Sequence, residues 1–156
     1  MRSHLGGYLL SSSKNNVTSL RYHQKRVAVT KTFTFDAAHK LEMYEGKCKN
    51  LHGHTYQLHI TISGFLNEIG MAVDFGEIKD IFQSVIKSRL DHKYLNDVLP
   101  SMNTTAENMI VWIWEQIEEE MVKRGLTEAG HRLETLTLFE TPTSSATLHR
   151  EWMIDE

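Results

Sequence analysis

Residues 54 to 62 read H-T-Y-Q-L-H-I-T-I, a stretch that alternates between two kinds of side chain. Residues of even number are mostly large and apolar, and residues of odd number are polar. The even set is His54, Tyr56, Leu58, Ile60 and Ile62, and the odd set is Thr55, Gln57, His59 and Thr61. Successive side chains of a strand point to opposite faces of a sheet, so this period of two predicts a strand with one buried face. Such half-buried strands are typical of antiparallel sheets.

Three further stretches show strand patterns. The run V-A-V-T-K-T-F-T-F at 27 to 35 alternates in the same way. Strands are also predicted at 133 to 139 (L-E-T-L-T-L-F) and at 146 to 153 (A-T-L-H-R-E-W-M), separated by a turn that contains Pro142. Residues with β-branched and aromatic side chains dominate these runs, as expected for strands.

Between the second and third predicted strands, the apolar period changes to three and four residues, the spacing of one helix face. The first such stripe is Phe75, Ile78, Ile81, Phe82, Val85 and Ile86. Asp74 can cap this helix, with Glu77 as its capping-box partner, and Thr104 with Glu107 forms a second capping box before a helix over about 105 to 123. The order of elements predicts an α+β domain with a four-stranded antiparallel sheet and two helices on one face.

The length of 156 residues and the 40% hydrophobic content suit one domain, which we expect over 27–156. Residues 1–26 are rich in Ser, Asn and basic residues and contain no acidic residue, so an irregular extension is predicted there. The net charge of −3 gives no electrostatic reason to bind nucleic acid or an anionic membrane. No apolar run approaches the roughly 20 residues of a membrane helix, and the single cysteine excludes an intrachain disulfide. A soluble, cytoplasmic protein is expected.

Three histidines lie at the ends of the first two predicted strands. His39 follows the first strand, and His52 and His54 begin the second with the same parity. If these strands pair as a hairpin, the three rings converge at one end of the sheet, because residues i and i+2 of a strand lie about 6.5–7 Å apart on one face. Three neutral imidazoles with an open position are typical of catalytic Zn²⁺. His59 has the opposite parity and is expected to be an ordinary surface histidine.

The single cysteine precedes this histidine pair in C-K-N-L-H-G-H (48 to 54), between Lys47 and Lys49. Two interpretations remain open from the residues alone. Cys48 either completes a closed, structural site with the histidines, or it stays off the metal as a free thiol. In the second case the lysines favour the thiolate, which can then act as a base or nucleophile.

Two acidic residues have candidate roles near such a site. Asp91 directly precedes His92, and a carboxylate can fix the tautomer of a neighbouring imidazole, although an Asp-His pair in a loop is more often merely solvated. Glu140 ends the third predicted strand. It is either exposed or receives two parallel N–H bonds from a planar, amidine-like edge of a ligand.

Several motifs occur in a fixed order along the chain. They are F-D-A-A-H (35 to 39), C-K-N-L-H-G-H-T-Y (48 to 56), V-D-F (73 to 75), L-D-H-K-Y-L-N-D (90 to 97), T-T-A-E-N (104 to 108) and F-E-T-P-T-S-S-A (139 to 146). Together they resemble the family of 6-pyruvoyltetrahydropterin and 6-carboxytetrahydropterin synthases over about 27 to 153. The resemblance implies the tunnelling fold (T-fold), in which chains assemble into a trimeric barrel and then a hexamer. Assembly would also cover the open sheet face and edges that four strands and two helices leave.

The resemblance also implies a role for each residue of the site. The zinc ligands, one ion per subunit, would be His39, His52 and His54. Cys48 would be the proton-abstracting thiolate, and Asp91 and His92 its partner relay. Glu140 would anchor a pterin ring and contribute to catalysis. The substrate-binding residues would be Glu140, Thr104 and Thr105.

The family contains branches with different products. The short C-x-x-x-H-G-H gap is similar to that of the carboxy-type enzymes, whereas animal pyruvoyl-type enzymes have a longer gap, and Cys48 argues against a branch that carries glutamate there. The resemblance therefore favours conversion of 7,8-dihydroneopterin triphosphate to 6-carboxytetrahydropterin, acetaldehyde and triphosphate, in the pathway to queuosine. The alternatives are the pyruvoyl-forming reaction, which retains the side chain, and a non-catalytic zinc-binding assembly module in which Cys48 is a fourth ligand.

Overall fold

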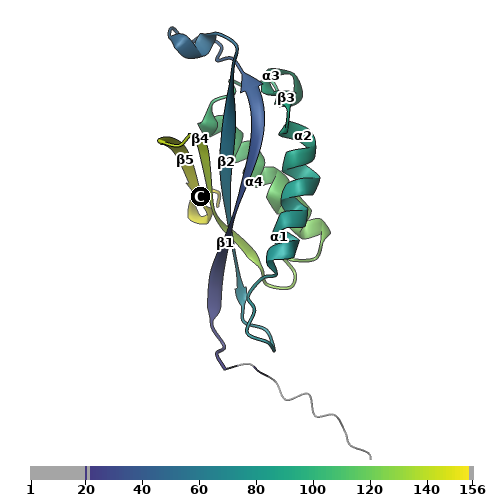
Figure 1. The fold of residues 1–156 in the computed structure, drawn as a ribbon. Coiled ribbons are helices and arrows are strands. Elements are labelled where there is room, and N and C mark those ends of the chain that lie inside the picture. Colours follow the sequence, from purple (N-terminus) through teal and green to yellow (C-terminus); the bar gives the residue numbers. More distant parts are fainter. Residues whose placement is uncertain (1–19, 21, 155–156) are drawn as a thin grey trace, which may run out of the picture.

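A long antiparallel hairpin forms the centre of the sheet in this computed structural model, which describes residue 20 and residues 22–154 (Figure 1). Strand β1 (Arg26–His39) pairs with β2 (His52–Phe65) along the full 14 residues of each strand. Strand β2 also pairs with β4 (Arg132–Thr141), which pairs with β5 (Ser144–His149). The predicted antiparallel pairing of these four strands is confirmed.

The helices lie on one face of this sheet (Figure 1). The first helical rod joins α1 (Phe75–Ile81), a π-helical turn η2 (Phe82–Lys87) and α2 (Ser88–Leu90). The short α3 (Leu95–Val98) and the long α4 (Ala106–Lys123) follow. Two 3-10 turns complete the elements, η1 (Lys47–Lys49) in the β1–β2 connection and η3 (Arg150–Trp152) after β5. Among the described residues, no helix is long and apolar enough to cross a membrane.

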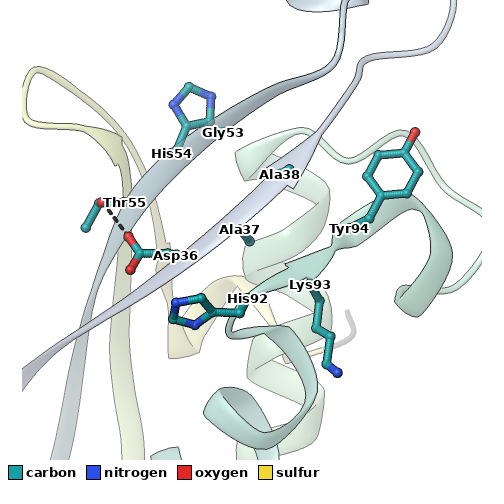
Figure 2. A pocket seen from close by; sticks show the side chains of 9 residues that line it. All are labelled: Asp36, Ala37, Ala38, Gly53, His54, Thr55, His92, Lys93 and Tyr94. Atoms are coloured by element: carbon teal, nitrogen blue, oxygen red, sulfur yellow. Dashed lines mark hydrogen bonds between the residues drawn. The ribbon is translucent and has the colours of Figure 1, made fainter.

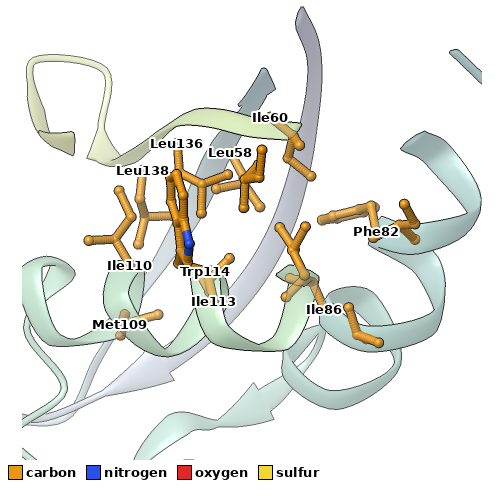
Figure 3. Close-up of a cluster of buried hydrophobic side chains, with 14 of the residues drawn as sticks. Leu58, Ile60, Phe82, Ile86, Met109, Ile110, Ile113, Trp114, Leu136 and Leu138 are labelled. Carbon is orange, nitrogen blue, oxygen red and sulfur yellow. The ribbon is translucent and has the colours of Figure 1, made fainter. Parts of the chain in front are cut away.

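The hydrophobic core fills the space between the sheet and the helices (Figure 3). Tyr56, Leu58, Ile60 and Ile62 of β2 are all fully buried, as their alternation predicts. They pack in a core with helix residues that include Phe82, Ile86, Met109, Ile113 and Trp114. Burial of each large apolar side chain contributes about 1.5–3 kcal/mol, so this layer is the main stabilising element of the domain.

The opposite face of the sheet is polar. It carries neighbouring threonines from successive strands, and Oγ1 of Thr30 lies 2.7 Å from Oγ1 of Thr61. Thr137 and Thr147 make a similar, longer contact between β4 and β5. No helix of the described part of the chain covers this face (Figure 1).

The sheet has a fifth strand, so the expected number of four is wrong. Strand β3 (Lys93–Tyr94) pairs in parallel with Ala37 and Ala38 of β1. The strand order is therefore β3-β1-β2-β4-β5. Two residues are too few to display an alternating pattern. This pairing forms because the chain that follows α2 runs beside the end of β1.

Helix and strand ends also differ from the sequence expectations. The last strand ends at His149, because residues 150–152 form a 3-10 turn. Asp74 caps α1 as predicted, but the Glu77 carboxylate lies 3.4 Å from Arg124 Nη1. Thr105, not Thr104, caps α4, and its hydroxyl accepts the N–H of Asn108. The predicted extension at 1–26 lies mostly outside the described residues, and β1 begins at Arg26.

Candidate metal centre

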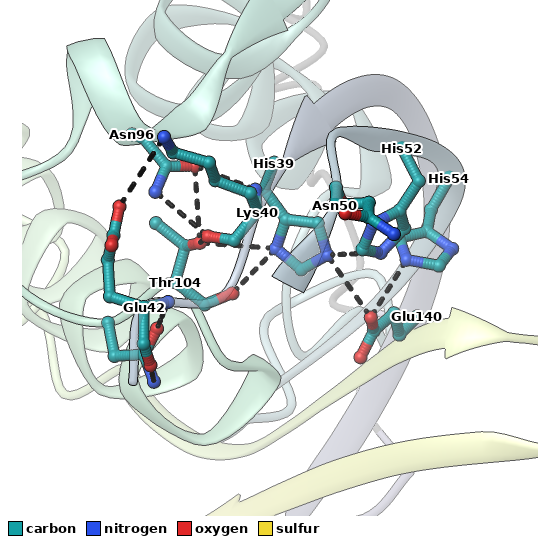
Figure 4. A network of polar contacts seen from close by, with 10 residues as sticks. His39, Lys40, Glu42, Asn50, His52, His54, Asn96, Thr104 and Glu140 are labelled. Atoms are coloured by element: carbon teal, nitrogen blue, oxygen red, sulfur yellow. Dashed lines mark hydrogen bonds and ion pairs between the residues drawn. The ribbon is translucent and has the colours of Figure 1, made fainter. Parts of the chain in front are cut away.

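The end of the β1–β2 hairpin brings three imidazole rings together. His39 and His52 are paired in the β1–β2 register, and His54 follows two residues along β2 on the same face. The ring centroids of His39 and His52 are 4.6 Å apart, and those of His52 and His54 are 4.7 Å apart. His39 is completely buried. Strand pairing therefore fixes all three rings at one end of the core (Figure 4).

The hydrogen bonds of the rings determine which nitrogen carries the proton. Nδ1 of His39 lies 2.8 Å from the carbonyl oxygen of Thr104, and Nδ1 of His52 lies 2.6 Å from that of Asn50. A carbonyl can only accept, so Nδ1 is the donor in both rings, and the Nε2 atom of each neutral ring keeps its lone pair. These two Nε2 atoms are 3.0 Å apart. Two lone pairs at this separation repel each other unless a proton or a metal ion lies between them.

Glu140 adds a carboxylate from β4 to the same centre. Its Oε1 lies 2.8 Å from Nε2 of His54 and 3.3 Å from Nε2 of His39 (Figure 4). Nε2 of His54 is buried, and despite this close approach it makes no aligned hydrogen bond. One ligand atom from each of the three histidines and Glu140 lies within 4.8 Å of the others. These residues fit a bound cation, since imidazole nitrogens and a carboxylate oxygen gather within this distance.

The ionisation states of His54 and Glu140 also suit the binding of a metal ion. Burial is the main reason that the pKa of His54 is lowered, although the nearby Glu140 opposes this shift. The pKa of Glu140 is lowered, chiefly by its contact with His39 and against the effect of burial. Near neutral pH the centre therefore presents a neutral His54 and an ionised Glu140, the forms that bind metal ions. Imidazole and carboxylate together suit zinc and several other transition metals.

Cys48 lies outside this centre. It is partly buried in η1, within the 40–51 connection that projects beyond the end of the hairpin (Figure 1). Its carbonyl accepts the N–H of Leu41 at 2.8 Å. Among the described residues, the groups that could hold a metal do not include it. The structure therefore brings the histidines and Glu140 together without Cys48.

Asp91 and His92 form a second polar group on the other side of β1. Nδ1 of His92 lies 3.1 Å from Oδ2 of Asp91, and Oδ1 of Asp91 accepts the N–H of Asp36 at 3.0 Å. That backbone bond is the main reason that the pKa of Asp91 is lowered. His92 has φ 58°, a left-handed conformation, and its N–H donates to the Asp36 carbonyl. Residue 36 thus holds both members of the pair through its backbone.

Two pockets meet at the start of β2. An open pocket of about 600 Å³ spans β1 and is lined by both His54 and His92 (Figure 2). A second pocket of about 490 Å³ lies toward β4 and includes Phe139 and Glu140. Both share Gly53, His54 and Thr55 as a common wall. The candidate metal centre therefore borders two neighbouring pockets, through His54 in both and Glu140 in the second.

Several residues of this region were not singled out by sequence reasoning. Asp36 supports Asp91 and His92, and Asn50 supplies the carbonyl that orients His52. Asp36 belongs to a motif with a histidine, but nothing in the sequence pairs it with residue 91. Thr104 was expected to line the substrate pocket, and the structure places it fully buried behind His39. The Thr105 side chain is occupied as the cap of α4.

Comparison with known proteins identifies the family of the chain. Residues 28–151 match the family model described as 6-pyruvoyl tetrahydropterin synthase. The chain belongs to this family. It is 38% identical over 123 residues to the 6-carboxy-5,6,7,8-tetrahydropterin synthase of Synechocystis sp., a match that covers 76% of this chain and 89% of that protein.

A second relative and a solved structure carry pyruvoyl-type names. The 6-pyruvoyl tetrahydrobiopterin synthase of Dictyostelium discoideum is 36% identical over 107 residues, covering 60% of this chain and 79% of that protein. The structure of Caenorhabditis elegans 6-pyruvoyl tetrahydropterin synthase superposes with a TM-score of 0.70 at 23% identity. It covers 83% of this chain and 99% of that chain, so the fold is shared.

Proposed function

We propose that this protein is a zinc-dependent 6-carboxy-5,6,7,8-tetrahydropterin synthase. It converts 7,8-dihydroneopterin triphosphate and water to 6-carboxytetrahydropterin, acetaldehyde and triphosphate, a step toward queuosine. The observation that carries the proposal is the convergence of the three histidine Nε2 atoms and Glu140 beside two pockets, in a chain of this family.

Each residue of the site has a separate role in this proposal. His39, His52 and His54 hold one zinc ion per subunit, and the ion supplies Lewis acidity toward the oxygens of the substrate side chain. Cys48 removes a proton as the thiolate, which Lys47 and Lys49 favour electrostatically.

His92, oriented by Asp91, delivers a proton on the other side of the pocket. The Glu140 carboxylate anchors the pterin ring, for which it has a second oxygen available. Thr104 acts on this site through His39, and Thr105 through the start of α4.

The spacing of the cysteine loop favours the carboxy-type product over the pyruvoyl-type product. Only three residues separate Cys48 from His52, the gap that carboxy-type sequences have. Coverage does not separate the branches, because the carboxy-type relative matches 76% of this chain and a second pyruvoyl-type relative, 35% identical over 130 residues, matches 73%. The identities of 38% and 36% do not separate the two branches, so the loop spacing decides.

A trimeric barrel, and a hexamer made from two of them, is the proposed assembly of the single domain at 27–156. The polar sheet face is uncovered in the described part of the chain, and β3 covers the edge of β1 only at Ala37 and Ala38. Strand β5 is the other edge. Pairing of these edges between copies satisfies their backbone groups, because an exposed edge presents unpaired N–H and C=O groups.

The product decides between the candidate activities. We expect the zinc-loaded protein, incubated with 7,8-dihydroneopterin triphosphate, to release acetaldehyde and triphosphate in equal amounts, because the proposed reaction breaks a carbon–carbon bond in each turnover. Acetaldehyde is measured with a coupled dehydrogenase and triphosphate by chromatography. Release of triphosphate without acetaldehyde would identify the pyruvoyl-forming reaction. Release of neither product would support the non-catalytic assembly module.

A further inference from the structure

Two asparagine side chains extend the pairing of β1 beyond its last residue. Oδ1 of Asn96 accepts the N–H of Lys40 at 3.0 Å, and its Nδ2 donates to the Lys40 carbonyl at 2.9 Å (Figure 4). Asn103 makes the same pair of bonds to Glu42, at 3.0 and 3.2 Å. A carboxamide carries one acceptor and a donor group, so each asparagine acts as a hydrogen-bonded strand partner.

The opposite edge of this segment holds the cysteine loop. In an extended chain, the N–H and C=O groups of residues i and i+2 point one way and those of residue i+1 point the other way. Lys40 and Glu42 therefore face the asparagines, while the N–H of Leu41 points away and donates to the carbonyl of Cys48 at 2.8 Å. The asparagines fix the segment onto which Cys48 is docked.

The same network continues to the metal centre through Thr104. Its hydroxyl donates to the Lys40 carbonyl at 3.3 Å and lies 3.5 Å from Oδ1 of Asn96. Thr104 also meets Nδ1 of His39 through its carbonyl at 2.8 Å and its hydroxyl at 3.2 Å. Both His39 and Thr104 are completely buried. Asn96 thus contacts Thr104, the residue that orients His39. Among the described residues, the side-chain hydrogen bonds of Asn103 go to Glu42, and its carbonyl accepts Nδ2 of Asn108.

We propose that Asn96 and Asn103 are positioning residues that hold Cys48 in a fixed relation to the histidine centre. Asn96 acts on both His39 and the cysteine loop, and Asn103 acts on the loop alone. The functional meaning of this arrangement rests on the proposed function, in which Cys48 is the base beside the metal. Neither asparagine touches the space that the substrate occupies in that proposal, since neither lines the two pockets at the start of β2.

The test uses the full chain with Asn96→Ala and Asn103→Ala, and Asn67→Ala as the matched control. Oδ1 of Asn67 also accepts two backbone N–H groups, from Ile69 and Met71, in the turn after β2 at the other end of the hairpin. All three variants lose side-chain to backbone hydrogen bonds. Only Asn96→Ala and Asn103→Ala lie near the proposed site. An effect that also occurs in Asn67→Ala therefore reflects a general loss of stability, and an effect absent from it reflects loss of positioning.

Three readouts need no substrate. Amide hydrogen exchange over residues 40–48 should rise about tenfold or more in Asn96→Ala and Asn103→Ala, because each loses two hydrogen bonds of ordinary strength. Alkylation of Cys48 by iodoacetamide should become several-fold faster in both. Zinc affinity, measured by competition with a chelator, should fall about 10-fold or more in Asn96→Ala only, since outer groups that orient a ligand have effects of this size. Asn67→Ala should leave all three unchanged.

A milder variant guards against misfolding. Asn103→Asp keeps the acceptor for the Glu42 N–H but loses the donor to its carbonyl, so its exchange and alkylation rates should lie between those of the parent and Asn103→Ala. Unchanged exchange and alkylation in folded Asn96→Ala and Asn103→Ala would overturn the proposal, as would equal effects in Asn67→Ala. Failure of the acetaldehyde assay with the unaltered chain would instead overturn the proposed function and leave these results standing.

Discussion

Cys48→Ala should abolish most of the turnover while leaving the metal in place. Removal of a positioned general base costs about 10²–10⁴-fold in rate, so we expect a loss of that size in kcat. The metal should remain because Cys48 lies in η1, outside the group formed by the three histidines and Glu140. Acetaldehyde release and the zinc content per chain, measured on the same sample, check both parts of the expectation.

Cys48→Ser is the matched variant for this experiment. It keeps a side chain of similar size, but its hydroxyl ionises far less readily than a thiol, so it should be as inactive as Cys48→Ala. Thermal unfolding should be unchanged in both. Parallel loss of zinc, stability and turnover would contradict the account and identify Cys48 as a structural ligand of a closed site.

His52→Ala is expected to empty the metal centre. His52 provides one of the two Nε2 atoms that face each other at 3.0 Å, and its Nδ1 is already fixed by the Asn50 carbonyl. Its removal leaves two imidazoles and a carboxylate. Zinc affinity should fall by more than about 100-fold. Loss of a residue that merely orients a metal ligand lowers the affinity by up to about that factor, and loss of the ligand itself should cost more. Chelator competition measures the affinity, and acetaldehyde release should be lost with it.

His59→Ala is the control for this change. His59 lies on the same strand, but its ring rests on Phe139 at 5.1 Å between centroids, on the polar face of the sheet. We expect its replacement to leave both zinc affinity and turnover as they are. Retention of full zinc affinity in His52→Ala would show that the metal is held elsewhere.

The central part of the fold is predictable because strand periodicity and burial coincide. The alternation at 54 to 62 correctly predicts the buried positions 56, 58, 60 and 62 of β2, whereas His54 is only partly buried. The pairing of β1 with β2 places His39 opposite His52. Strand β3 and the π-helical turn η2 are different. Two residues show no period, and apolar residues at Phe82, Val85 and Ile86 have the same spacing in an α-helix and in the observed turn.

The site was only partly predictable for a related reason. The three histidines converge because two consecutive strands fix them. The local alternation of apolar and polar residues can predict such strands from the sequence. Glu140 joins them from β4, which follows β2 only after a long helical connection. The β2–β4 pairing shifts register between Thr61 and Ile62, and the β4–β5 pairing shifts between Phe139 and Thr141. The position of Cys48 depends on Asn96 and Asn103, about fifty residues further along the chain. No local pattern around residues 40–51 contains that information.

X-ray absorption at the zinc edge of the loaded protein tests the central claim most directly. The claim is that zinc is held by imidazole and oxygen ligands while Cys48 remains a free thiol beside it. The predicted spectrum contains only nitrogen and oxygen neighbours at about 2.0–2.2 Å. A sulfur neighbour at about 2.3 Å would contradict the account, because Cys48 is the single cysteine of the chain.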